Sequence, residues 1–110
     1  MNKFETELKA GNFVTSECSY CKKIVWPPSD YCDSCFKEVN WRKVSENGII
    51  IESSRKENDI FCITEFENKI RVMGKLDTEI NTVKPGQFVK LTRCLFNDKN
   101  SFFFNLENGQ

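Results

Sequence analysis

The sequence contains no histidine, so it lacks the side chain that most often serves as a general base near neutral pH. Without an imidazole, no Ser-His arrangement can activate a nucleophile. The sequence also lacks a glycine-rich loop of the type that cradles phosphate groups. Aspartate and glutamate are scattered over expected turns and exposed strand positions. These absences argue against an independent enzyme.

Long apolar runs and an excess of charge of one sign are also absent. No apolar segment approaches the roughly 20 residues that a membrane-spanning helix needs. In a chain of 110 residues, 16 lysines and arginines balance 16 aspartates and glutamates. Proteins that bind DNA or RNA electrostatically normally show a basic footprint. The composition therefore argues against a membrane helix and against a strongly electrostatic nucleic-acid binder.

Two Cys-x-x-Cys pairs near the N-terminus are the most specific feature that is present. Cys18 and Cys21 form the first pair, Cys32 and Cys35 form the second, and residues 22–31 lie between them. A two-residue gap lets two thiolates reach one ion from a single tight turn, and four thiolates satisfy tetrahedral Zn²⁺. Four protein ligands leave no open coordination position. We therefore expect one structural zinc ion bound by these four cysteines.

Two disulfide bonds in a secreted domain are the alternative reading of the same four cysteines. The chain opens with MNKFE and shows no apolar signal segment, so we expect reduced thiols and a cytoplasmic location. Iron also suits a tetrahedron of four thiolates and is an alternative metal. Cys62 and Cys94 lie in expected strands, without metal-ligand spacing. We expect them to pack in the core, with a reactive or ligand role as the alternative.

The remaining pattern predicts a mainly β protein with one short helix. Phe4 and Leu8 are four residues apart and predict a helix over residues 2–11, with Gly11-Asn12 as its stop. Strand-length segments separated by turn residues follow. We expect strands at Phe13–Ser16, Ile24–Trp26, Trp41–Ser45, Gly48–Ser54, Ile60–Glu67, Ile70–Leu76, Phe88–Phe96 and Ser101–Leu106.

The connections between the later strands carry turn residues, and their spacing indicates a small barrel. The Lys84–Gln87 segment has the composition of a type II turn. Five or six strands over this length fit a closed barrel of the OB type. We expect an N-terminal helix and a rubredoxin-like zinc ribbon over residues 1–41, and an OB-fold barrel over residues 42–110. The other expected turns are Asn47-Gly48, the charged Arg55–Asp59, Asn68-Lys69 and Asn97–Asn100.

Several short motifs along the whole chain occur in an order that one known family shares. They are Phe13-Val14, Cys18–Cys21, Trp26-Pro27-Pro28, Tyr31–Cys35, Trp41, Gly48 and Lys84-Pro85-Gly86. In this order the chain resembles the zinc-ribbon/OB-fold acyl-CoA-associated proteins. The cysteine spacing alone is common to many ribbons. The Trp-Pro-Pro step and the downstream barrel make the resemblance more specific.

The resemblance implies a non-catalytic accessory or scaffold subunit. Members of this family accompany thiolase-fold enzymes that act on acyl-CoA. The implied partners are acetoacetyl-CoA thiolase and hydroxymethylglutaryl-CoA synthase, which the small protein bridges while it helps to hold the coenzyme A chain. Other relatives serve steroid side-chain lyases. The connection over Ser53–Asp59 is shorter than the Pro-rich loop that relatives often carry there, which leaves the identity of the partner open.

Two groups of residues beside the cysteines are candidates for contact with a partner or with coenzyme A. Trp26 and Pro27 lie in a loop that the two cysteine pairs hold at both ends, and they can offer a rigid apolar platform for a pantetheine arm or a partner surface. Alternatively, Trp26 seals the junction between ribbon and barrel. Lys22 and Lys23 are candidates for a coenzyme A phosphate, with a solvated turn as the alternative.

The run Phe102-Phe103-Phe104 bears on an alternative function, the binding of single-stranded nucleic acid. Exposed aromatic side chains on an OB face stack with bases. Successive strand residues point to opposite faces, so either Phe103 alone or both of its neighbours face the core. Basic residues do not surround the run. The neutral charge and the Trp-Pro-Pro step favour the accessory subunit.

Overall fold

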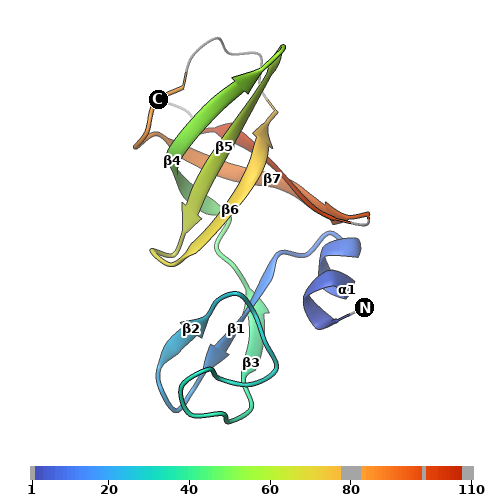
Figure 1. Cartoon of the computed structure of the whole chain (residues 1–110), viewed down its shortest axis with the longest axis vertical. Coiled ribbons are helices and arrows are strands. Elements are labelled where there is room, and N and C mark those ends of the chain that lie inside the picture. Colours follow the sequence, from blue (N-terminus) through green and yellow to red (C-terminus); the bar gives the residue numbers. More distant parts are fainter. Residues whose placement is uncertain (1, 78–82, 98, 108–110) are drawn as a thin grey trace.

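The computed structural model describes residues 2–77, 83–97 and 99–107. The molecule is elongated, at 45 × 28 × 20 Å, with a three-stranded sheet at one end and a closed barrel at the other (Figure 1). The chain is mainly β, as expected, and the short helix lies beside the boundary between these two parts. None of the described helical residues forms a helix long and apolar enough to cross a membrane.

Helix α1 (Lys3–Lys9) lies within the predicted residues 2–11 and ends before the predicted stop at Gly11. The Asn2 side chain accepts a hydrogen bond from the Glu5 backbone N–H at 2.8 Å, which caps the N-terminus. Gly11 follows the C-terminus with a φ of 89°, a conformation that costs glycine little. Phe4 and Leu8 lie buried on one face. The short helix is therefore confirmed.

The N-terminal sheet has β1 (Val14–Cys18) at its centre, between β2 (Lys23–Val25) and β3 (Asn40–Lys43), and both pairings are antiparallel. The expected strand at Trp41–Ser45 corresponds to β3. The sequence pattern places it in the barrel, which is wrong, because β3 pairs with β1 of the N-terminal sheet. The sequence of a short strand does not specify which neighbouring strand it will pair with. The division of the chain at residue 41 stays a prediction.

The barrel has the strand order of an OB fold. Its strands run in the order β4-β5-β6-β8-β7, with β7 pairing back to β4. The contact between β6 and β8 is parallel, and every other contact in the barrel is antiparallel. This arrangement confirms the expected five-stranded barrel. The strands are β4 (Asn47–Lys56), β5 (Asp59–Phe66), β6 (Ile70–Leu76), β7 (Phe88–Phe96) and β8 (Asn100–Leu106).

Two connections differ from expectation. Asn47-Gly48 was predicted as a turn, but β4 begins there, and a Cβ atom on Gly48 would lie 2.6 Å from Thr64 Cγ2. The glycine therefore allows close packing. The charged connection after residue 54 is a tight hairpin, because β4 continues to Lys56 and the turn between the strands contains Glu57 at a φ of 58°.

The turn before β7 is confirmed. Gly86 has a φ of 92°, and the Gln87 N–H donates to the Lys84 carbonyl at 3.3 Å, as a type II turn requires. The turn between β5 and β6 contains Glu67 and Asn68, both at positive φ, which confirms the expected hairpin. The connections over 77–87 and 97–100 both include residues outside the described ranges.

One apolar core joins the helix to the barrel. Phe13, which precedes β1, contacts Phe66 with ring centroids 5.5 Å apart and Phe102 at 4.9 Å. Phe102 and Phe104 are buried and Phe103 is not, which resolves the orientation of the aromatic run. Cys62 and Cys94 lie in the same core, as predicted. Burial raises the pKa of the Cys94 thiol to about 11.

Candidate metal centre and adjoining groove

The four predicted cysteines converge on one point. Their Sγ atoms all lie within 4.8 Å of one another. Cys18 and Cys35 are 3.6 Å apart, and Cys21 and Cys32 are 3.8 Å apart. A tetrahedral zinc ion with Zn–S bonds of about 2.3 Å separates its ligands by about 3.8 Å. The donor set and its dimensions fit a closed four-thiolate site, and these cysteines can hold a metal ion.

Backbone N–H groups around the cluster favour thiolates. The Cys21 N–H donates to Cys18 Sγ at 3.3 Å, and the Ser34 N–H donates to Cys32 Sγ at 3.4 Å. The N–H groups of Cys35 and Ser34 lower the pKa of the Cys32 thiol to about 6. Contacts with the sulfur atoms of Cys35 and Cys32 raise the pKa of Cys21 to about 12. Four adjacent thiolates repel one another, so full deprotonation needs a bound cation.

The two lysines after Cys21 have different surroundings. Lys23 Nζ donates to Asp33 Oδ1 and to Ser34 Oγ, both at 2.6 Å, and so ties the two metal turns together. Lys22 is exposed, at a φ of 56°. Neither lysine lines the groove described below. A role for them in binding coenzyme A stays a prediction.

The Trp-Pro-Pro loop is fixed at both ends by one buried hydroxyl group. Ser16 Oγ donates to the Val25 carbonyl at 3.2 Å and accepts a hydrogen bond from the Ser29 N–H at 3.1 Å. Trp26 is half-buried, and its ring meets those of Phe4 and Phe13 edge-on, with centroids 5.7 and 6.0 Å away. Trp26 therefore helps to seal the junction between sheet and barrel.

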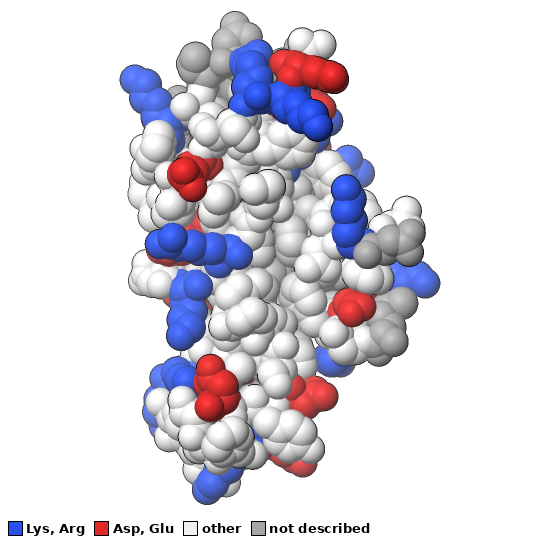
Figure 2. Space-filling model, viewed as in Figure 1, with Lys and Arg blue, Asp and Glu red and all other residues white. Residues whose placement is uncertain are grey.

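Trp26 lines a groove of about 680 Å³. Its lining includes Trp26, Pro27 and Pro28, residues of helix α1 and residues of strands β6, β7 and β8. On the face in Figure 2, a largely uncharged band runs down the molecule between charged side chains. The barrel side contributes Arg71, Val72, Met73, Phe96, Lys99, Asn100 and Phe102. No sequence motif marks these residues, because strands remote in sequence supply them.

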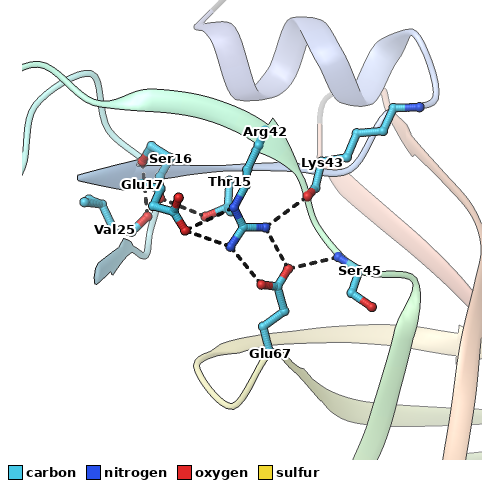
Figure 3. A network of polar contacts seen from close by, with 8 residues as sticks. All are labelled: Thr15, Ser16, Glu17, Val25, Arg42, Lys43, Ser45 and Glu67. Atoms are coloured by element: carbon cyan, nitrogen blue, oxygen red, sulfur yellow. Dashed lines mark hydrogen bonds and ion pairs between the residues drawn. The ribbon is translucent and has the colours of Figure 1, made fainter. Parts of the chain in front are cut away.

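A polar network links the N-terminal sheet to the barrel (Figure 3). Arg42 Nε donates to Glu17 at 3.1 Å, and its two terminal nitrogens donate to Glu67 at 3.0 and 2.8 Å. Glu67 also accepts from the Ser45 N–H at 2.9 Å. The guanidinium of Arg42 is the main cause of the lowered pKa of Glu67. Sequence reasoning missed this network, because isolated charged residues carry no signal of their partners.

No protein-family model and no curated protein matches this sequence. Solved structures do match. One is a chain of an "Ltp2-ChsH2(DUF35) aldolase" structure, with a TM-score of 0.73, 17% identity and 96% of each chain covered. Another is a DUF35-family protein of unknown function from Sulfolobus solfataricus, with a TM-score of 0.66, 19% identity, and 96% of this chain and 83% of that chain covered. This chain therefore has the zinc-ribbon/OB fold of DUF35-family structures.

Proposed function

We propose that this protein is a zinc-binding, non-catalytic accessory subunit of an enzyme that acts on acyl-CoA thioesters. The observation that carries the proposal is the match over 96% of both chains to a chain of the Ltp2-ChsH2(DUF35) aldolase structure. The name of that structure pairs a DUF35 protein with an enzyme. By the sequence resemblance, thiolase-fold enzymes are the partners to test first, namely acetoacetyl-CoA thiolase and hydroxymethylglutaryl-CoA synthase.

The cysteine cluster supports a structural rather than a chemical role. Cys18, Cys21, Cys32 and Cys35 would hold one Zn²⁺ and fill its coordination sphere, and the ion would supply rigidity to the ribbon. In such small modules the free energy of metal binding is folding free energy, on the order of 10–16 kcal/mol. The absence of histidine fits the same role. All described cysteines are free of disulfide bonds, which fits a reducing cytoplasm.

The groove supports contact with a partner or with the pantetheine arm of coenzyme A. Its volume of about 680 Å³ lies within the usual range for ligand pockets, and its lining includes the aromatic side chains of Phe4, Trp26, Phe96 and Phe102. We propose that Trp26 and Pro27 make this contact. Lys22 and Lys23 directly follow Cys21, and we propose them as weaker contacts for a phosphate of coenzyme A.

Affinity capture of the tagged chain from its native lysate, followed by reconstitution with the purified partner, tests the proposal. We expect a thiolase-fold enzyme to co-purify and to form a complex of fixed stoichiometry by size-exclusion chromatography with light scattering. The isolated chain should not turn over acyl-CoA thioesters. Turnover by the pure chain, abolished by a point substitution in it, would refute the accessory role. Binding to single-stranded oligonucleotides that weakens steeply with salt would favour the alternative function instead.

A further inference from the structure

A second hollow, here called the barrel hollow, adjoins the groove beside Trp26. It measures about 350 Å³ and is lined mainly by residues of β5, β6 and β8. The residues that line both hollows are Met73, Lys99, Asn100 and Phe102. A ligand long enough to leave the groove can therefore continue into the barrel hollow.

Three side chains of the barrel hollow form a row on the outer face of the barrel. Phe61 on β5 pairs with Lys75 on β6, and Lys75 pairs with Phe103 on β8. The chain neighbours of each are buried, so all three point outward, because successive strand residues face opposite sides. The Arg93 guanidinium carbon lies 4.0 Å from the centroid of the Phe103 ring. Basic residues do not flank Phe103 in the sequence, but the fold brings Lys75 and Arg93 beside it.

The barrel hollow is lined by two lysines, and none of its described lining residues is acidic. Lys75 Nζ lies 3.1 Å from Asp59 Oδ1, but this pair is exposed, and exposed pairs hold their charges only weakly. The exposed Lys99 side chain forms no ion pair with any described residue and lies where the two hollows adjoin. Lys22 and Lys23 line neither hollow. The barrel hollow therefore suits an anionic group.

The groove beside Trp26 has a different character. Glu5 lines it, and its carboxylate would repel an anion. Arg71 also lines it, but the Arg71 guanidinium donates to Glu65 at 2.8 Å and is already paired. Trp26 and Pro27 add an uncharged surface. An uncharged, flexible arm therefore suits the groove, whereas phosphate groups suit the barrel hollow.

We propose that the barrel hollow binds the nucleotide half of coenzyme A. The adenine ring lies against Phe61 and Phe103, because a base stacks on aromatic side chains. Lys75 and Lys99 attract the phosphate groups. Coenzyme A joins an adenine nucleotide to pantetheine through a diphosphate, and the same order of chemistry runs from the phenylalanine rings past Lys99 to Trp26. The inference takes the identity of the ligand from the proposed function, whereas the nucleotide site can be tested separately.

Calorimetric titration of the full chain, purified with its metal, tests the nucleotide site. The probes are coenzyme A, pantetheine and adenosine 3′,5′-bisphosphate, which lacks the arm. We expect the bisphosphate to bind, and coenzyme A to bind at least about tenfold more tightly than either part, because it joins both. Failure of the bisphosphate to bind overturns the site and leaves the accessory role standing, since assembly with the enzyme is measured separately. Tighter binding of ATP or of a single-stranded oligonucleotide overturns coenzyme A as the occupant.

Substitutions on the outer face identify the contacts. We expect Phe103→Leu and Lys99→Ala each to weaken coenzyme A binding by at least about fivefold at low salt, through loss of stacking and of a phosphate contact. Phe103→Tyr keeps the ring and should bind as the wild type does. Lys90→Ala is the matched control, because Lys90 is an exposed lysine of β7 that lines neither hollow. Equal binding by Phe103→Leu, Lys99→Ala and Lys90→Ala overturns the proposal.

Discussion

Arg42 and Glu67 form two parallel hydrogen bonds, at 3.0 and 2.8 Å, across the junction between the N-terminal sheet and the barrel. Arg42 lies on β3, and Glu67 lies in the turn between β5 and β6 at a φ of 52°. The groove takes one wall from each part of the molecule. The pair therefore ties the N-terminal sheet to the barrel, together with the aromatic contacts of Phe13.

Replacing Arg42 by methionine should weaken the junction. The pair is bidentate but partly exposed, so we expect a loss of about 1 kcal/mol in the free energy of unfolding. Urea denaturation measures it. Glu67→Gln should give a similar loss, whereas Glu17→Gln should cost less, because only one oxygen of Glu17 contacts Arg42 and its side chain is more exposed, at 43% against 21% for Glu67. Equal stability of all three variants and the wild type would show that apolar packing alone sets the junction.

The contribution of Glu67 should vanish in acid. Its pKa in the folded protein lies below the ordinary value of 4.5, chiefly because Arg42 donates to the carboxylate. The ionised form is therefore favoured by folding, and the stabilisation is fully present above about pH 4.5. It is lost as the pH falls through the lowered pKa. The difference in unfolding free energy between wild type and Glu67→Gln should shrink over that range, and a difference independent of pH would contradict this assignment.

The metal site predicts one zinc ion per chain in protein purified without chelator. Cys32→Ser removes one thiolate, so we expect metal content to fall and the ribbon to loosen while the barrel partly survives. Elemental analysis gives the content, and amide NMR spectra report the two parts separately. Cys94→Ser, in the core and away from the cluster, should keep its metal. Full-length protein that carries no metal would contradict the prediction.

Trp26→Ala should weaken association with the partner by about 2 kcal/mol, the usual effect of losing an aromatic anchor. Metal content should stay unchanged. Because Trp26 also contacts Phe4 and Phe13, we expect a lower melting temperature as well. Calorimetric titration and thermal unfolding separate the two effects. Lys22→Ala and Lys23→Ala should matter less, and mainly at low salt. Unchanged binding by Trp26→Ala would assign the side chain to the core seal alone.

Thr64→Val should leave the protein equally or more stable. Thr64 Oγ1 is buried and makes no hydrogen bond with any described group. A buried polar atom without a partner is unfavourable, so a valine of the same shape should add up to about 1 kcal/mol to the free energy of unfolding. Thermal unfolding tests this. The change lies inside the barrel, away from the cysteines, so metal content should not change. A clear loss of stability would indicate that the hydroxyl group has a partner, such as a buried water molecule.

The sequence by itself determined the features that depend on neighbouring residues. Asn2 and Gly11 bound the helix because capping is local, and Gly86 sets its turn through its own φ angle. The Cys-x-x-Cys spacing brings two sulfur atoms together within one turn, which is why the cluster was predictable. Strand-length segments separated by turn residues predicted the strands.

The tertiary structure decided which distant residues meet. β3 joined the N-terminal sheet rather than the barrel, and Gly48 lies at a close packing contact rather than in a turn. Arg42 pairs with Glu67, and β6 and β8 share only two residue pairs in the described part of the chain. All strand edges offer the same backbone groups, and charged side chains of one sign are chemically alike. Local sequence therefore does not specify which strand or which charge each of them meets, and the packing of the core decides it.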